Sequence, residues 1–388
     1  MTALLDNQSF EATTQKISVS RDSTGKLTRG SNPCFAYSAD GQPAWVSKEG
    51  EPIQGVYVDL PDLEYHQLSN MISSSALKLF ASDPHEGECR YRGTPDESSI
   101  SPQLKRAWNC GHLLHGLLLE PERMDYGVIS ESSALELRQK GAVVIEDHDS
   151  LKKYLSDNYL DRGKSIAERI DIARCFNRNV VYYPNYVSKV SEQEKRGKRY
   201  ICSEDRHRVE TCASLVKNTD IYKYNFENSG YSELTIIVFD PSSNMWIKAR
   251  LDRVSVKRDR RTQKLERFLL DVKTIHTLSP DQIYKDIEQK LYSIQGAFYH
   301  YAAQLIGFEL VQDEFALLFI EWDRHIRYQL VELSDKGWAD SVSYIHEVYE
   351  DMVIWLNSQN NKACLNATGI MIVNPTFFKL KKRVRVET

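Results

Sequence analysis

Apolar positions in the first half of the chain recur mainly at helical spacing. Residues 104–118 form such a stripe, which ends before Pro121, a residue that cannot continue a helix. A shorter helix is expected to begin near Ser73, whose side chain suits an N-cap, and to end before Pro84. Between about 130 and 215 the chain is more polar and alternates short helical patterns with extended pieces. This half therefore predicts a helix-rich segment.

From Gly230 the pattern changes to that of strands. The runs SELTIIVFD, MWIKARLDRVSV and RFLLDVKT are β-branched or alternating, so they predict three adjacent strands. Ser279, Pro280 and Asp281 then mark the start of one long helix, whose apolar stripe continues to Leu305. Two further strands, EFALLFIEWD and RYQLVEL, and a final helix, GWADSVSYIHEVYEDMVIWLNS, complete the pattern.

Together these elements predict an α/β fold with a mixed central sheet flanked by helices. The first 50 residues are largely polar and have no sustained period, so we expect a partly flexible extension ahead of the domain. The expected domain spans residues 51–360, with a helical insertion at about 130–195, and residues 361–388 form a C-terminal tail.

The composition is typical of a folded globular protein. Of its 388 residues 41% are hydrophobic, which is enough for a sizeable core. No apolar run approaches the ~20 residues that cross a bilayer, and the N-terminus lacks the pattern of a secretory signal, so we expect a cytoplasmic protein without membrane contact. The cysteines are odd in number and never spaced as CxxC, which predicts neither disulfides nor a zinc site. They are Cys34, Cys89, Cys110, Cys175, Cys202, Cys212 and Cys364.

The net charge of -4 is unlike that of a protein that coats nucleic acid, but the local charge distribution is uneven. Between Lys248 and Arg267 lie nine lysines or arginines against three acids. Five of them fit the tip of a hairpin, where they would either contact backbone phosphates or form a solvated turn. These five are Lys257, Arg258, Arg260, Arg261 and Lys264.

Charged residues also interrupt the apolar strands. Alternation places Asp271 and Lys273 on one face of a strand and Val272 on the other. Pairing with the preceding strand would bring Asp252 beside Asp271, where two carboxylates repel unless a cation such as Mg²⁺ or Mn²⁺ joins them. This arrangement suits metal-assisted hydrolysis of a phosphodiester. The alternative is a strand end that reaches the surface and carries a local ion pair.

Two pairs of residues at helical spacing add to these acids. His115 follows Gly111 by four positions on the apolar helix, so the glycine allows a close backbone approach on the face that carries the imidazole. Gln295 and Tyr299 are also four apart, on the helix after the Asp-x-Lys strand, where both could reach a phosphate or a base. The competing interpretation of His115 is a core histidine whose hydrogen bonds are made within the protein. That of Gln295 and Tyr299 is an ordinary helix edge.

The order Gly-x-x-x-His, strand-ending Asp, Asp-x-Lys and Gln-x-x-x-Tyr resembles the PD-(D/E)xK nuclease superfamily, with its restriction-endonuclease-like core, in its RecB-like branch. The stretches GVYVDLPDLEYHQLSNMISSSALKLF, CGHLLHGLLLEPERM, SELTIIVFD and KARLDRV resemble more closely the C-terminal nuclease domain of the exonuclease VIII (RecE) family of phages and prophages. The resemblance covers about residues 52–357. Leu251 stands where the superfamily name has proline, and the region at about 130–195 is longer than expected.

The resemblance implies a role for each of these residues. Asp252, Asp271, the Val272 carbonyl and His115 would bind Mg²⁺, with Mn²⁺ as an alternative. Lys273 would orient or activate the attacking water, and Glu233 is a weaker candidate acid. Gln295 and Tyr299 would hold the DNA strand near the scissile phosphate.

The family implies an exodeoxyribonuclease that degrades one strand of linear duplex DNA from its 5′ end and leaves 3′ single strands for recombination. It also implies a homo-oligomer and a partner that anneals single strands. Two alternatives are a RecB-like repair or defence nuclease with other polarity or endonuclease activity, and a catalytically silent DNA-binding protein on the same fold. This chain lacks the cysteine quartet that some RecB-like nucleases use for an iron-sulfur cluster, which argues against that subgroup of the first alternative. A catalytically silent protein would have no chemical reason to keep His115, Asp252, Asp271 and Lys273 together.

Overall fold

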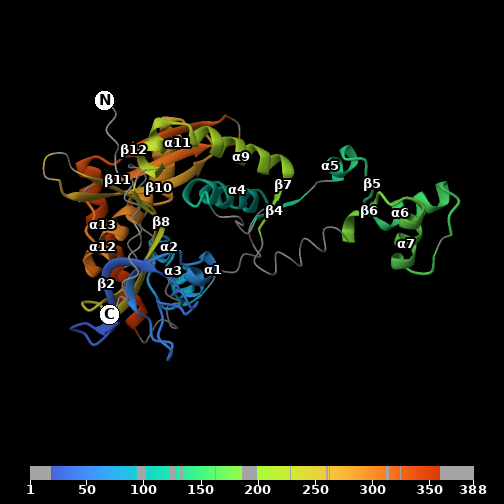
Figure 1. The fold of residues 1–388 in the computed structure, drawn as a ribbon. Coiled ribbons are helices and arrows are strands. Elements are labelled where there is room, and N and C mark those ends of the chain that lie inside the picture. Colours follow the sequence, from blue (N-terminus) through green and yellow to red (C-terminus); the bar gives the residue numbers. More distant parts are fainter. Residues whose placement is uncertain are drawn as a thin grey trace, which may run out of the picture. The chain divides into compact units, whose positions relative to one another are not determined.

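The computed structural model forms two compact units, which are described separately (Figure 1). The first comprises residues 1–98 and 218–388, and the second comprises residues 99–217. The residues that the structure describes are 19–93, 102–122, 128–131, 134–161, 163–185, 199–227, 229–258, 261, 263–311, 314–323 and 325–358. Among the helices of these ranges, none has both the length and the apolar character needed to cross a membrane.

The first unit is built on a mixed eight-stranded sheet with the strand order β1-β2-β3-β8-β9-β10-β11-β12. The pairs β2/β3 and β10/β11 are parallel, and the other neighbours are antiparallel. The strands are β1 Ser20–Arg21, β2 Leu27–Phe35, β3 Gln54–Val58, β8 Gly230–Asp240, β9 Met245–Arg258, β10 Leu265–Ile275, β11 Phe315–Glu321 and β12 Arg327–Glu332.

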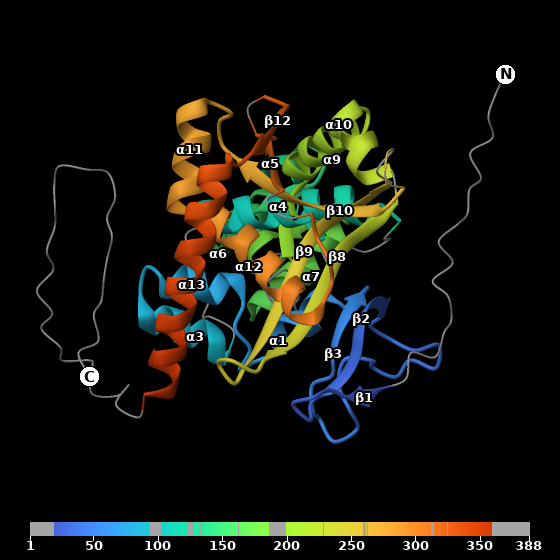
Figure 2. The same cartoon turned by 90° about the vertical axis from the view of Figure 1, so that its left-hand side faces the viewer.

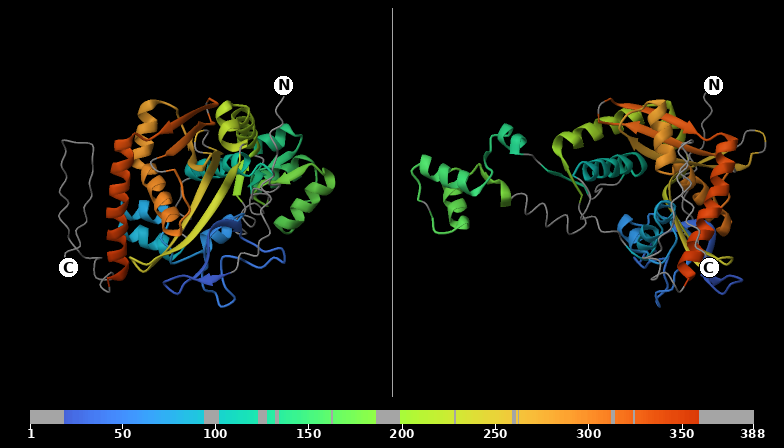
Figure 3. Two further views of the ribbon diagram at one scale, coloured as in Figure 1. Left: turned by 60° about the vertical axis from the view of Figure 1, so that its left-hand side comes forward. Right: turned by 180° about the vertical axis from the view of Figure 1, so that it is seen from behind.

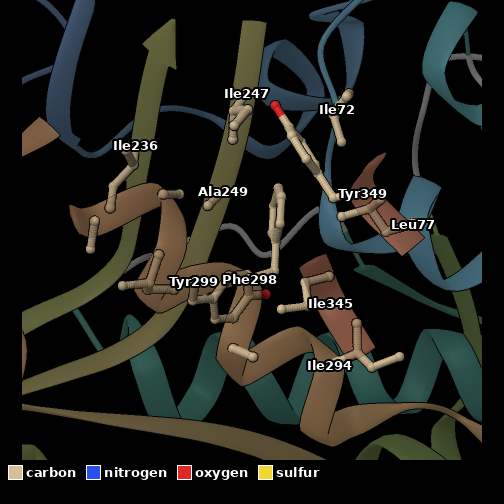
Figure 4. Close-up of a cluster of buried hydrophobic side chains, with 14 of the residues drawn as sticks. Ile72, Leu77, Ile236, Ile247, Ala249, Ile294, Phe298, Tyr299, Ile345 and Tyr349 are labelled. Atoms are coloured by element: carbon tan, nitrogen blue, oxygen red, sulfur yellow. The ribbon is translucent and has the colours of Figure 1, made fainter. Parts of the chain in front are cut away.

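Helices cover this sheet and close its main core. Helix α12 packs on β8 and β9, and α13 lies beside α12 (Figure 2). Side chains from α2, β8, β9, α12 and α13 meet in one apolar cluster, with Phe298 of α12 fully buried among them (Figure 4). The helices are α1 Asp62–Gln67, α2 Ser74–Phe80, α3 Pro84–Arg92, α10 Asp220–Tyr222, α11 Pro280–Gln289, α12 Tyr292–Ile306 and α13 Asp335–Asn357, and a π-helical turn spans Lys223–Glu227.

Strand β8 is buried on both faces, because a second core lies on the other side of the sheet. Ile236 belongs to the main cluster, whereas Ile237 packs with Tyr57 and Tyr65. The continuous apolar run in β8 follows from this double burial, since successive residues of a strand point to opposite faces. The central strand that carries Glu233 is therefore held firmly from both sides.

The mixed α/β architecture and the three adjacent strands β8, β9 and β10 confirm the sequence prediction. The prediction of a single long helix after β10 was wrong, because one helix ends at Gln289 and a second begins at Tyr292. Leu291 between them has a φ of 52°, in the left-handed region. The apolar stripe continues across this break, so periodicity alone could not show it. Strands β1 and β2 lie in the range expected to be an extension, where the polar sequence gave no strand signal.

Gly296 allows α12 to lie close to the sheet. A Cβ added at this position would be 2.4 Å from Cδ1 of Phe315 on β11. We expect Gly296→Ala to lower the free energy of unfolding by about 1–3 kcal/mol, because the extra methyl group overpacks the interface. Urea denaturation measures this change.

Gly337→Ala is the matched control in α13. A Cβ there would meet the Ser334 hydroxyl at 3.3 Å, and this small side chain can adjust. Since alanine favours helix over glycine by about 1 kcal/mol, this variant should be neutral or slightly stabilised. Equal behaviour of the two variants would contradict the close approach at Gly296.

The second unit combines helices with two short parallel strand pairs, β4/β7 and β5/β6. Arg106 of α4 donates to Asp205 of α9 through Nε at 2.6 Å and Nη2 at 2.5 Å, so a two-pronged ion pair joins these helices. Helices α6 and α7, green in Figure 3, pack together on β5 and β6 around Leu151 and Leu155. The elements are α4 Pro102–Leu119, β4 Val128–Glu131, α5 Ala134–Gln139, β5 Val143–Ile145, α6 His148–Asp157, α7 Ile166–Phe176, β6 Val180–Tyr182, β7 Arg199–Cys202 and α9 Ser203–Lys217.

Candidate active site

The hairpin of β9 and β10 brings Asp252 and Asp271 together, as the sequence predicted. Leu270 pairs with Arg253, so the two aspartates occupy the next position of the antiparallel ladder. The backbone N–H of Val272 donates to Oδ2 of Asp252 at 2.9 Å. Both aspartates are buried, with exposures of 8% for Asp252 and 0% for Asp271. Two acids are thus placed side by side in a region that water barely reaches.

Glu233 adds a third carboxylate from the neighbouring strand. The ladder pairs Ser232 with Arg253 and Leu234 with Leu251, which places Glu233 opposite Asp252. One carboxylate oxygen of each lies within 4.8 Å of the other. Glu233 has a φ of 50°, a strained conformation for a side chain of this kind. Its Oε2 lies 3.7 Å from Nε of Arg250, so the Arg250 guanidinium partly balances the negative charge of the carboxylates.

Lys273 balances Asp271 on the same strand face. Its Nζ lies 2.5 Å from Oδ2 of Asp271 and 4.8 Å from the centre of the Tyr292 ring. Burial alone would lower the pKa of Lys273, but the carboxylates of Asp271 and Asp252 raise it above its ordinary value. Lys273 therefore stays protonated at neutral pH, and it acts as a fixed positive charge and hydrogen-bond donor, with no capacity to accept a proton.

Gln295 and Tyr299 of α12 turn inward to the aspartates. Nε2 of Gln295 donates to Oδ1 of Asp271 at 2.9 Å and to the hydroxyl of Tyr299 at 2.6 Å. Both side chains are buried, with exposures of 6% and 4%. Gln295 therefore contacts the Asp271 carboxylate directly, and Tyr299 accepts a hydrogen bond from the same Gln295 amide. Their contact with a DNA strand stays a prediction.

Lys78 of α2 is a site residue that the sequence did not reveal. Its Nζ donates to Oε1 of Gln295 at 2.9 Å, which fixes the amide so that its NH₂ group faces Asp271. Burial, followed by the nearby ammonium of Lys273, lowers the pKa of Lys78 to about 7. The only sequence signal was its place on the short helix with the Ser-x-Ser pattern, far from the acids along the chain.

Carboxylate oxygens that gather on adjacent strands suit a hard divalent cation. Mg²⁺ and Mn²⁺ prefer oxygen ligands, and Glu233, Asp252 and Asp271 supply them from adjacent strands. Burial raises the pKa of Asp252, although Lys273 acts in the opposite direction. A cation at these oxygens would offset the cost of burying the Asp252 carboxylate.

The remaining predicted site residues occupy several places. His115 lies half-buried on α4 of the second unit, between the buried Leu114 and Leu118, and its role as a metal ligand stays a prediction. Val272 is fully buried on β10, and its carbonyl role is also a prediction.

The basic hairpin residues are described only in part. The ammonium of Lys257 lies 3.9 Å from the ring centre of Tyr224 and 4.6 Å from that of Phe268, so it packs on aromatic side chains. Arg258 ends β9 and Arg261 is exposed at the hairpin tip. Arg260 and the C-terminal tail lie outside the described residues. The phosphate contacts expected from these residues stay a prediction.

No protein-family model matches the chain, and no curated protein matches it. Among solved structures, it is similar to a putative exonuclease from Eubacterium rectale, with a TM-score of 0.36 and 11% sequence identity, over 82% of this chain and 96% of that chain. It is also similar to the protein SSO0001, with a TM-score of 0.23 and 15% identity, over 56% of this chain and 90% of that chain. At such TM-scores neither structure defines the fold of this chain, and its chemistry rests on its own side chains.

Proposed function

We propose that this chain is a Mg²⁺-dependent deoxyribonuclease with a PD-(D/E)xK core. We further propose that it acts as an exonuclease of the exonuclease VIII type, which degrades linear duplex DNA from 5′ ends and leaves 3′ single strands for recombination. Mn²⁺ is expected to substitute for Mg²⁺. A homo-oligomeric state and a single-strand annealing partner belong to the same proposal and rest on the family resemblance.

The observation that carries the proposal is the contact between the two catalytic strands. The Val272 N–H holds Asp252 at 2.9 Å, while Lys273 lies 2.5 Å from Asp271, so two acids and one lysine converge from adjacent strands. A structural ion pair needs one acid for one lysine. Two more acids, the buried Asp252 and the half-buried Glu233, bring carboxylate oxygens within 4.8 Å of each other, and a cation between them would offset their repulsion.

Each side chain then has a distinct task. Asp252, Asp271 and Glu233 would hold the cation, which neutralises phosphate charge and lowers the pKa of a coordinated water. Lys273, kept protonated by its acidic neighbours, donates to the attacking water or to the charge that develops on the phosphate. Gln295 fixes the orientation of the Asp271 carboxylate through its 2.9 Å hydrogen bond. The proposed role of His115 as a further metal ligand rests on the family resemblance.

The proposal is tested by digesting linear duplex DNA, labelled at either the 5′ or the 3′ end, in parallel with covalently closed circular DNA. Each substrate is incubated with Mg²⁺ or with EDTA. We expect the linear DNA to be degraded only with Mg²⁺, the 5′ label to be released first as short products, and the circle to survive.

Other outcomes separate the alternatives. Early release of the 3′ label would show that degradation starts at 3′ ends and would contradict the proposed polarity. Cutting of the closed circle would favour a RecB-like endonuclease. Binding of DNA without any metal-dependent cleavage would favour the catalytically silent protein and refute the enzyme proposal.

A further inference from the structure

Three lysines from separate elements surround the ring of Tyr292. The distances from Nζ to the ring centre are 5.6 Å for Lys78 of α2, 4.8 Å for Lys273 of β10 and 5.8 Å for Lys290 at the end of α11. We call these three residues the Tyr292 lysine cluster. Ammonium groups favour an aromatic face, yet they repel one another when gathered at one ring. The three ammonium groups therefore create a region of positive electrostatic potential around the Tyr292 ring.

Two of the three lysines in the cluster form an ion pair with a carboxylate. Lys273 pairs with Asp271 at 2.5 Å, and Lys290 pairs with Asp286 at 2.6 Å. The hydrogen bond of Lys78 goes to the neutral oxygen of Gln295, and within the described residues Lys78 forms no ion pair. Burial and the neighbouring ammonium of Lys273 lower the pKa of Lys78 to about 7, although the carboxylates of Asp271 and Asp252 act in the opposite direction. An anionic ligand would supply the missing counter-charge.

Exposure increases from the acids outward. The Lys273 side chain is 14% exposed and that of Lys290 is 51% exposed, while the Tyr292 ring between them is buried. Asp286, the partner of Lys290, also accepts a hydrogen bond from Nε2 of Gln282, so its carboxylate is held close to its own helix. The cluster therefore leads from the carboxylate site to the surface of the first unit.

We propose that the Tyr292 lysine cluster binds a backbone phosphate of the DNA strand, next to the phosphate that is cut. This inference rests on the proposed nuclease function. The carboxylates of Glu233, Asp252 and Asp271 attract a cation, whereas the lysines on the Tyr292 side attract an anion. A strand whose scissile phosphate lies at the carboxylates would present the adjacent phosphate to Lys78 and Lys290. Lysine suits this task because it binds phosphate as a compact point charge.

The test measures binding of a short fluorescent linear duplex in EDTA, over a range of KCl concentrations, by anisotropy. Lys290→Gln is the main variant, because its exposed side chain can be changed without disturbing the core. We expect the slope of log K against log salt concentration to fall in magnitude by about 0.9, the value for one lost phosphate contact. Lys78→Met should weaken binding roughly tenfold, as expected for loss of a charge-assisted hydrogen bond.

Lys336→Gln is the matched control. Lys336 also forms an ion pair four positions along its helix, with Asp340 at 2.8 Å, but it lies on α13. It should keep the wild-type affinity and salt slope. If Lys290→Gln behaves like Lys336→Gln, the phosphate site is refuted. A wild-type protein that fails to degrade DNA with Mg²⁺ refutes the proposed function. An active wild type whose Lys290→Gln variant binds DNA with unchanged affinity and salt slope refutes this inference alone.

Discussion

Asp252→Asn is expected to abolish metal-dependent DNA hydrolysis, by roughly 10³-fold or more, while the metal-free protein stays folded. The amide oxygen of asparagine can still accept the hydrogen bond from the Val272 N–H, so the local backbone keeps its contact. Burial disfavours the charged form of Asp252, and a neutral side chain removes that penalty. The free energy of unfolding in EDTA should therefore change by no more than about 1 kcal/mol. Nuclease assays and urea denaturation measure the two effects.

Asp240→Asn provides the opposite control on the same sheet. Asp240 is also buried, but its Oδ2 accepts hydrogen bonds from the hydroxyls of Tyr349 at 2.7 Å and Tyr301 at 2.9 Å. We expect added Mn²⁺ to raise the thermal stability of the wild type. Asp240→Asn should lose stability but keep this expected Mn²⁺ effect, whereas Asp252→Asn should lose the effect. Retention of the Mn²⁺ effect in Asp252→Asn would exclude Asp252 from the metal site.

Lys273→Met is expected to lower the free energy of unfolding by about 3–5 kcal/mol, because it leaves the fully buried Asp271 carboxylate without its cation. The hydrogen bond from Gln295 remains, but it comes from a neutral group. The double variant Asp271→Asn/Lys273→Met removes both charges and should recover most of the loss. Urea denaturation in EDTA of the wild type, both single variants and the double variant gives the coupling energy.

Lys336→Met controls for the general effect of replacing a lysine, since its side chain is 83% exposed. It should change stability by less than about 1 kcal/mol. The interpretation of Lys273 and Asp271 as a buried pair fails if Lys273→Met costs no more than this control, or if the single effects simply add in the double variant.

The strand part of the site could be predicted because it depends on local rules. Alternation along β10 fixed Asp271 and Lys273 on one face, and a short connection between β9 and β10 required an antiparallel hairpin. The mixed sheet flanked by helices followed from the same periodicities. The assignments of metal ligands to His115 and the Val272 carbonyl stay predictions, because they were carried by family resemblance.

Other parts of the site depend on contacts that no local pattern encodes. Lys78 reaches Gln295 across 217 positions of the chain, and its own helix carries no acid that would mark it. Glu233 has a left-handed φ of 50° between two residues that pair regularly with β9, and neither strand alternation nor the residue type predicts this conformation. Sequence periodicity describes which face a residue occupies, but it does not describe which distant helix covers that face.

The break at Leu291 separates the helix that orients Asp271 from the helix that ends at Lys290. Helix α12 carries Gln295 and is fitted to the sheet through Gly296. Helix α11 carries Lys290 at its end and is anchored at its beginning, where the backbone N–H of Leu278 donates to Oε2 of Glu321 at 2.8 Å. Because each helix also has its own contact with β11, through Glu321 for α11 and Phe315 for α12, we expect substitutions near Lys290 to change the affinity for a ligand and to leave Gln295 in place.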